Sequence, residues 1–587
     1  MVSTVYVPVT HPQPCQQSSE SIRNRIEIVA EDIPELERFY NIMTSPQRAA
    51  RLRVYYDEQL TDLTRVAFDS LDQQGKVDYL LLKNYLERRR RQLDLEVARD
   101  QKTEPLLGPF ASTITALCED RQKARPLDAK KAAQDVHDVQ NAIQTLKAQV
   151  QNSQITMDKF SAFRAANTVD ELRARLAEWY DFYKGYDPLF SWWVAQPYAA
   201  ADQQLGEYAA LIREKLVGIK PGEQDDAIVG QPIGRDGLLV ELEAEKIAYT
   251  PEELLWIGEQ EYAWCEAEMK KVSREMGFGD NWRAALAVVR EDYVEPGQQT
   301  QLVRDLALEA IEYVQKHDLV TVPPLAAEAW RMFMMAPERQ KVNPFFLGGQ
   351  SIIVSYPTDT MDHEAKLMSM RGNNIHYARA TVFHELIPGH HLQLFINARH
   401  RLYRRLFGTP FSVEGWALYW EMVLWDDERF PKTPSNRVGM LFWRMHRCAR
   451  ILFSIKFHLG QLSPEECIDL LVDMVGHERA TAEGEVRRSL NGDYSPLYQA
   501  GYMLGALQLY SLRQELVVTG RMAEKEFHDR ILRNNQMPIE FVRALLIDLP
   551  LSADYRASWR FYGDPSSRTI LFCLPDTDTE GADCNHQ

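Results

Sequence analysis

The sequence lacks any continuous apolar run of 18 residues or more, so we expect no membrane-spanning helix. A secretory signal peptide has a basic segment followed by an apolar one. The residues from Met1 to Gln17 do not show this pattern. The residues from Ala582 to Gln587 match no retention or peroxisomal signal. These absences predict a cytosolic protein with no membrane partner.

Cysteine is scarce, and no two cysteines form a Cys-x-x-Cys pair. The seven cysteines are scattered over positions 15, 118, 265, 448, 467, 573 and 584. An odd and unpatterned set indicates reduced thiols in a reducing compartment rather than a disulfide framework. This agrees with the cytosolic location that the missing signals predict.

Positive charge is in deficit, since the net charge is −17 and the isoelectric point is about 5.4. This balance argues against nucleic acid or an anionic membrane as partner. One basic run, Arg88 to Arg91, interrupts the acidic pattern. In so acidic a chain we interpret it as the solvated side of a helix, and a nucleic-acid patch is the alternative.

Helical periodicity dominates the 587 residues and predicts a mainly α protein. We divide it into a loose polar lead-in (1–22), an N-terminal helical region (23–235), a second region (236–563) and a loose tail (564–587). Aromatic residues at 186, 190, 192 and 193 predict a core at a helix junction, with a sugar- or peptide-binding platform as the alternative. The sequence does not indicate an oligomeric state.

Histidine is also rare, with 14 residues, yet three histidines fall between His384 and His391. Apolar side chains three and four apart from Ile375 to Leu386 predict a helix that carries the first of them. Pro388 and Gly389 interrupt this helix, and an apolar helical pattern resumes from Leu392. The second region is therefore organised around a broken helix with a His-Glu pair on one side and a His-His pair on the other.

A zinc hydrolase with its site on a helix usually has His-Glu-x-x-His, where the two imidazoles hold the metal. Here the second histidine comes two or three residues late. On a straight helix, His390 would lie about 240° round from His384 and His391 about 10 Å along the axis. Pro388 cannot donate a hydrogen bond to the carbonyl of His384, and Gly389 can take a left-handed or otherwise unusual conformation. A bulge that absorbs two residues would bring His390 back.

We therefore favour His390 as the second metal ligand and keep His391 as the alternative. A kinked core helix with polar residues that cap the break is the competing interpretation. The position of Glu385, directly after His384, argues against a simple kinked helix. Burying a His-Glu pair and a His-His pair costs free energy unless a metal or a hydrogen-bond network compensates.

Further polar residues after the motif fit the same chemistry. Glu414 opens an apolar helix, and a carboxylate on a second helix is the usual third ligand beside two histidines. Glu421 lies on nearly the same face and can orient a ligand histidine. For both glutamates, a surface charge is the alternative. Tyr498 and Tyr502, four residues apart, can face a developing oxyanion or belong to the core.

Residues Ser351 to Pro357 are β-branched and bounded by breakers, so they predict one of few strands. Such a strand beside the motif helix pairs with an extended substrate or is purely structural. A long helix from about 435 to 460 carries the basic residues Arg444, His446, Arg447, Arg450 and His458. Some of them can bind a terminal carboxylate, although most are expected to be structural.

The motifs at 384–393 and 414–418, with the spacing to 498–505, resemble the DUF885 family of zincin-like metallopeptidases, over roughly residues 25 to 560. The resemblance implies a large multi-helix zincin-like metallopeptidase fold with a small β-sheet beside the active-site helix. It also implies that Glu385 is the general base, that the metal ligands are His384, His390 and Glu414, and that Tyr498 and Tyr502 supply the oxyanion hydroxyls.

One stretch departs from the family pattern, in which an Asp-Thr-Gly run commonly precedes the histidine that matches His458. Here the run is Ser454 to Phe457, which lacks the carboxylate and gains Lys456. The change suggests altered substrate specificity or chemistry other than peptide hydrolysis.

We expect a Zn²⁺-dependent hydrolase of short peptides or amide-bearing small molecules, with Glu385 activating the metal-bound water. The first alternative is a metal-dependent biosynthetic enzyme that uses the same site for condensation, cyclisation or elimination. The second is a non-catalytic binding protein on the same scaffold.

Overall fold

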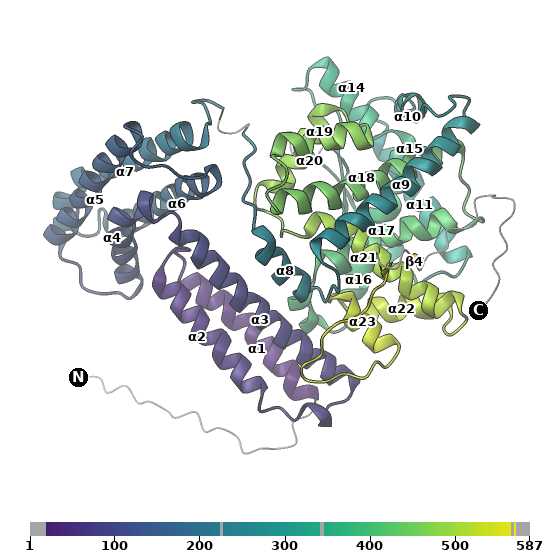
Figure 1. The fold of residues 1–587 in the computed structure, drawn as a ribbon, viewed down its shortest axis with the longest axis horizontal. Coiled ribbons are helices and arrows are strands. Elements are labelled where there is room, and N and C mark those ends of the chain that lie inside the picture. Colours follow the sequence, from purple (N-terminus) through teal and green to yellow (C-terminus); the bar gives the residue numbers. More distant parts are fainter. Residues whose placement is uncertain (1–18, 224–226, 341–344, 565–568, 571–587) are drawn as a thin grey trace.

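A computed structural model of the chain describes residues 19–223, 227–340, 345–564 and 569–570. The prediction of a mainly helical protein is confirmed (Figure 1). None of the described helices combines the length and the apolar composition needed to cross a membrane.

The N-terminal helices form two groups. The first group is α1 (Ser19–Phe39), α2 (Pro46–Leu63) and α3 (Gln73–Gln101). The second group is α4 (Glu104–Gln122), α5 (Ala129–Gln151), α6 (Lys159–Tyr183) and α7 (Pro188–Ile212). Helices α4 to α7 enclose a core of their own, and they form a separate lobe in Figure 1.

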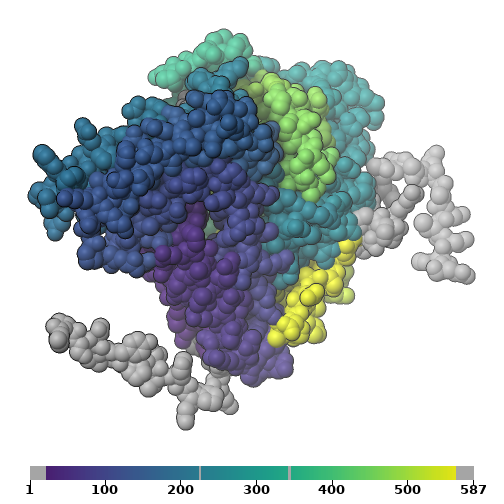
Figure 2. Space-filling model, turned by 60° about the vertical axis from the view of Figure 1, so that its left-hand side comes forward, coloured from purple at the N-terminus to yellow at the C-terminus, as the bar shows by residue number. Residues whose placement is uncertain are grey.

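The remaining helices form the larger part of the molecule. They are α8 (Gly234–Ala244), α9 (Pro251–Glu275), α10 (Trp282–Arg290), α11 (Gln299–Lys316), α12 (Pro324–Glu328), α13 (Pro337–Gln340), α14 (His363–Gly372), α15 (Ile375–Glu385), α16 (His390–Asn397), α17 (Pro410–Asp426), α18 (Pro434–His458), α19 (Pro464–Val475), α20 (Arg479–Leu490), α21 (Tyr498–Arg513), α22 (Glu524–Arg533) and α23 (Ile539–Leu546). Helices α1 to α3 share their apolar core, and Figure 2 shows the N-terminal helices, in purple to blue, lying against the later ones.

The apolar cores therefore divide differently from the predicted regions. Part of the region 23–235, namely α1 to α3, packs into the core of the region 236–563. Residues 19–22, placed in the lead-in, already belong to α1, whereas residues 1–18 lie outside the described part. The tail begins with two short antiparallel strands, β3 (Gly563–Asp564) and β4 (Thr569–Ile570). The domain boundaries themselves stay a prediction.

The predicted strand is confirmed, although it is shorter than expected. Strand β2 (Ile352–Val354) pairs in parallel with β1 (Met332–Met334). Ile352 and Val354 are buried in one cluster with apolar residues of α15. The small sheet therefore lies beside the helix that carries the histidine motif.

Two expectations for side chains need correction. Of the aromatic cluster, Phe190 is buried, but Tyr186 is 81%, Trp192 80% and Trp193 40% exposed, so the prediction of a core position is wrong for these three. Arg88 to Arg91 lie on α3, but their side chains are only 22–46% exposed. They form ion pairs with carboxylates of α1, α2, α3 and α8, which tie the helices together.

Candidate metal centre

The histidine motif spans a break between two helices. The side chain of Asn374 caps α15 by accepting hydrogen bonds from the backbone of His376 and Tyr377. Helix α15 ends at Glu385, because Leu386 leaves the helical conformation at φ −109° and ψ −106°. Helix α16 then starts at His390. The predicted interruption is confirmed. Across it, the amides of Gly389 and Leu392 donate to the carbonyls of Phe383 and Leu386, six residues back instead of four, so the break absorbs two residues as the predicted bulge does.

Gly389 is required by a close approach rather than by a left-handed backbone. Its φ is −75° and its ψ is −133°. A Cβ atom at this position would overlap the carbonyl oxygen of His384. Only glycine therefore lets the start of α16 lie this close to the end of α15.

The three predicted metal ligands come together. Ligand atoms of His384, His390 and Glu414 lie within 4.8 Å of one another, and all three side chains are buried. The Nε2 atom of His390 is 3.0 Å from Oε2 of Glu414, and that of His384 is 3.5 Å from the same oxygen. The turn has moved His390 to the side of α15 that carries His384.

His391 points elsewhere, which disfavours the alternative ligand. Its Nδ1 lies 3.0 Å from the carbonyl oxygen of Gln350, and its Nε2 lies 3.1 Å from that of Ala326. The imidazole therefore fastens α16 to α12 and to the segment before β2. It does not belong to the group of ligand atoms around Glu414.

Glu421 orients His384 from behind. Its Oε1 is 2.8 Å from Nδ1 of His384, which leaves Nε2 facing Glu414. Burial by itself would lower the pKa of His384, but hydrogen bonds to Glu414 and Glu421 outweigh it and raise the pKa to about 9. The sequence placed Glu421 on the correct face for this contact.

The carboxylates of Glu414 and Glu385 are tuned in opposite directions. Burial by itself would raise the pKa of Glu414, but His390 and His384 hold it well below its usual value. For Glu385, burial dominates and raises the pKa, and Glu414 adds to the effect. The Oε2 atom of Glu385 lies 3.9 Å from Nε2 of His390. Gly348 covers Glu385 so closely that a Cβ there would overlap the carboxylate.

The two predicted tyrosines reach the centre from α21. The hydroxyl of Tyr498 donates a hydrogen bond to Oε1 of Glu414. The ring of Tyr502 is stacked on that of His384, with 6.1 Å between centroids and 16° between planes. Close approach of α21 to α17 makes this possible, since a Cβ on Gly505 would overlap the backbone of Phe411.

A cationic group behind Tyr502 includes residues whose contacts the sequence could not assign. The guanidinium groups of Arg450 and Arg447 lie 4.4 and 5.6 Å from the centre of the Tyr502 ring. Arg450 Nε donates to Glu485 at 2.7 Å, and both residues are buried. Helical spacing showed that the arginines share α18, but the partner Glu485 comes from α20. His458, at the end of α18, lines a separate cavity.

The residues of the cluster fit a zinc ion. Two imidazole nitrogens and one carboxylate oxygen form the donor set of many catalytic zinc sites. A divalent cation would also offset the cost of burying Glu385 beside Glu414. Further support comes from Glu421, since such a carboxylate commonly fixes the tautomer of a ligand histidine.

The fold and this cluster define a mainly helical protein with two histidines and a glutamate arranged as metal ligands. The chain belongs to the DUF885 family, whose model, described as "Bacterial protein of unknown function (DUF885)", matches residues 41–546. The predicted resemblance to this family is confirmed, while the zincin-like class is not addressed by the match. A search of curated proteins found no match.

Two solved structures resemble the fold. One is described as "a putative lipoprotein of unknown function" from Shewanella oneidensis, with 18% identity, a TM-score of 0.64, and coverage of 90% of this chain and 99% of that one. The other is "the putative lipoprotein" from Colwellia psychrerythraea, with 17% identity, a TM-score of 0.57, and coverage of 91% and 100%. At these identities the likeness shows the fold alone.

Proposed function

We propose that the protein is a zincin-like, zinc-dependent hydrolase of short peptides or amide-bearing small molecules. The observation that carries the proposal is the convergence of His384, His390 and Glu414 around one point, with Glu385 beside them. The chemistry that zinc supplies in such a site is Lewis acidity, which activates water and polarises a carbonyl group.

Glu385 is the general base in this proposal. A buried carboxylate with a raised pKa takes a proton from water more readily than an exposed one. Glu385 then passes that proton to the leaving amine, so one side chain serves both halves of amide cleavage. His384, His390 and Glu414 would hold the metal, and Glu421 keeps His384 in the required tautomer.

The tyrosines of α21 take different roles. Tyr498 positions Glu414 through its hydroxyl and can shift that hydrogen bond to the oxyanion of the substrate. Tyr502 supports His384 through ring stacking and is the second oxyanion residue in the proposal. The small sheet formed by β1 and β2, beside α15, is where an extended substrate backbone would pair.

A metal-dependent biosynthetic enzyme is the second candidate, and the departure at Ser454 to Phe457 favours it. Ser454 is buried, and its hydroxyl donates to the carbonyl of Arg450 at 2.6 Å within α18. No carboxylate therefore stands at this position beside the arginines of that helix. The descriptions of the two solved neighbours concern those proteins, and a cytosolic location stays our prediction for this chain.

Glu385→Gln tests the proposal. The variant should retain zinc, because the ligands are intact, and lose turnover of a peptide library by about 10²–10⁴-fold. The matched control is Glu364→Gln, an exposed glutamate on α14 that should leave turnover unchanged. Full activity of Glu385→Gln would sink the assignment of the base. Conversion of small molecules by a chain that cleaves no peptide would favour the biosynthetic alternative.

A further inference from the structure

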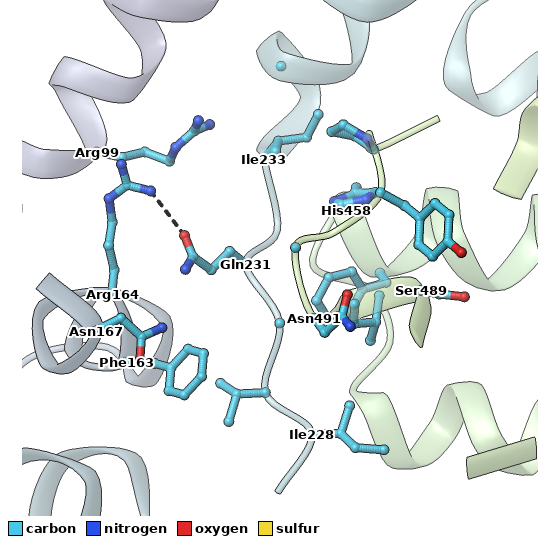
Figure 3. Close-up of a pocket in the computed structure, with 18 of the residues that line it drawn as sticks. Arg99, Phe163, Arg164, Asn167, Ile228, Gln231, Ile233, His458, Ser489 and Asn491 are labelled. Carbon is cyan, nitrogen blue, oxygen red and sulfur yellow. Dashed lines mark hydrogen bonds between the residues drawn. The ribbon is translucent and has the colours of Figure 1, made fainter. Parts of the chain in front are cut away.

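A cavity of about 500 Å³ lies between the N-terminal helices and the region of the metal centre. This volume lies in the range of small-molecule sites. Arg99 of α3 and Arg164 of α6 line one side, and His458 and Asn491 line the other (Figure 3). In the same view, the 227–233 segment with Gln231 passes between the two sides. The cavity thus joins elements that are far apart in the sequence.

The arginine side of the cavity carries positive charge that nearby carboxylates offset only partly. Within 4.0 Å and among the described residues, Arg99 meets one carboxylate, Glu96, at 3.7 Å. Arg164 contacts Asp100 at 2.6 Å and Gln231 at 3.0 Å, which engages two of its five donor hydrogens. Burial first, and then the charge of Arg164, lower the pKa of Arg99. Such an environment favours an anionic ligand.

The other charged residues that line the cavity keep an excess of positive charge there. Arg487 adds a third guanidinium, and the acidic residues of the lining are Glu96 and Glu241. Glu241 is held by an ion pair with Arg88 and by the amide of Gln92 at 2.5 Å. It is therefore engaged on its own side of the cavity.

A buried histidine, His458, lines the opposite side. His458 is 8% exposed, and its Nδ1 has no hydrogen-bond partner among the described residues. Burial, and then the charge of Arg99, lower its pKa to about 4, so the ring is neutral at neutral pH.

The cavity adjoins the metal centre through two tyrosine rings. Tyr494 lines the cavity, and its ring lies 4.3 Å from that of Tyr498. The hydroxyl of Tyr498 in turn donates to Glu414. A ligand anchored in the cavity therefore lies on the side of Tyr498 away from the proposed metal.

We infer that this cavity binds the carboxyl end of the substrate, with Arg99 and Arg164 facing the carboxylate. The inference rests on the proposed function and adds a substrate class to it, namely amides that carry a free carboxylate. Free peptides and N-acylated amino acids both carry this group. Peptides with an amidated C-terminus lack the charge and would bind weakly.

Equilibrium dialysis against Glu385→Gln tests the inference without turnover. The probe is an equimolar mixture of N-acetylated tripeptides with free C-termini and the same tripeptides as C-terminal amides, measured by mass spectrometry. The free acids should be retained at least about tenfold more strongly than the amides. N-acetylated amino acids in a parallel dialysis distinguish the shorter ligand from the longer one, and preferential retention of either acid over its amide supports the site.

Substitutions in the Glu385→Gln background locate the binding. Arg99→Gln and Arg164→Gln should each abolish most of the preference for acids, whereas Arg91→Gln, on the same helix α3 but paired with Glu243, should retain it. Equal retention of acids and amides, or a preference that survives both substitutions, would overturn the inference. A different result would contradict the proposed function alone: the acids bind, but the wild-type chain with zinc cleaves no peptide.

Discussion

The contact between Glu421 and His384 decides which imidazole nitrogen faces the metal centre. Both side chains are buried, and the carboxylate lies 2.8 Å from Nδ1. Arg447 forms an ion pair with the same oxygen of Glu421 at 3.8 Å. The orientation of His384, the first proposed ligand, therefore depends on residues outside the proposed ligand set.

Glu421→Gln should weaken zinc binding by about 10–100-fold, because a neutral amide holds the required tautomer less firmly than a carboxylate. Competition with a chromophoric zinc chelator measures the change. Glu428→Gln, at an exposed glutamate just after α17, is the control and should leave affinity unaltered. Equal affinities for the two variants would contradict the orienting role.

The sequence identified the residues of the candidate site but not all of the groups that they contact. His384, His390 and Glu414 follow from residue types and spacing, since few other arrangements satisfy a His-Glu pair next to a helix break. The contacts of His391 could not be predicted, because its partners are backbone carbonyls of Ala326 and Gln350. Every residue has a backbone carbonyl, so the sequence does not show which carbonyl accepts a hydrogen bond.

The turn between α15 and α16 is the element on which the site depends. It spans four residues and brings the ring of His390 beside that of His384, with 4.9 Å between the centroids. The short distance between Gly389 and the carbonyl of His384 sets how tight this turn is.

Gly389→Ala should lower the free energy of unfolding by about 2 kcal/mol or more, because the new Cβ overlaps backbone that cannot rotate away. Urea unfolding followed by circular dichroism measures the change. Gly372→Ala is the control, since a Cβ there meets only the side chain of Phe345 at 3.4 Å. An unchanged free energy of unfolding in Gly389→Ala would contradict this prediction, because it would show that the backbone can move apart to accept a Cβ atom.

Signals local to the sequence predicted the elements well. Capping boxes at Thr250 and Ser463 start α9 and α19, and both can be recognised in the sequence, as Thr-Pro-Glu-Glu and Ser-Pro-Glu-Glu. The exact backbone path of the break could not be predicted, because it depends on the fit of α16 against α12 and α17 rather than on local preference. The strand at 352–354 was recognised by its β-branched residues, but its parallel partner at 332–334 was not.

On the scale of the whole molecule, one large core and one smaller core hold the helices together. The sequence could not predict that α1 to α3 share the larger core, because periodicity shows that a helix has an apolar face but not which helix covers it. Several histidines are buried within this architecture. His528 illustrates the consequence, since it is fully buried between Tyr419 and the backbone of Leu319, each at 2.7 Å.

Burial lowers the pKa of His528 to about 4 from an ordinary value of 6.5. Between these values the unfolded chain binds a proton that the folded chain does not, so stability falls as the pH drops from 6.5 towards 4. His528 alone would account for about 3 kcal/mol of this loss.

Urea unfolding at pH 7 and pH 5 checks this contribution. His528→Gln should reduce the difference in stability between the two pH values, even if it lowers stability at both. His400→Gln, at an exposed histidine, should leave the difference as it is in the wild type. A pH dependence that is the same in all three proteins would contradict the role of His528.

The metal content of the purified chain tests the central claim most directly. Elemental analysis should find about one zinc ion per chain in the wild type and in Glu385→Gln, since the proposed base is not a ligand. His384→Ala and Glu414→Ala should lose the ion, because each removes one of three protein ligands. A wild-type chain without zinc after incubation with the metal, or zinc retained at full occupancy in both ligand variants, would contradict the account.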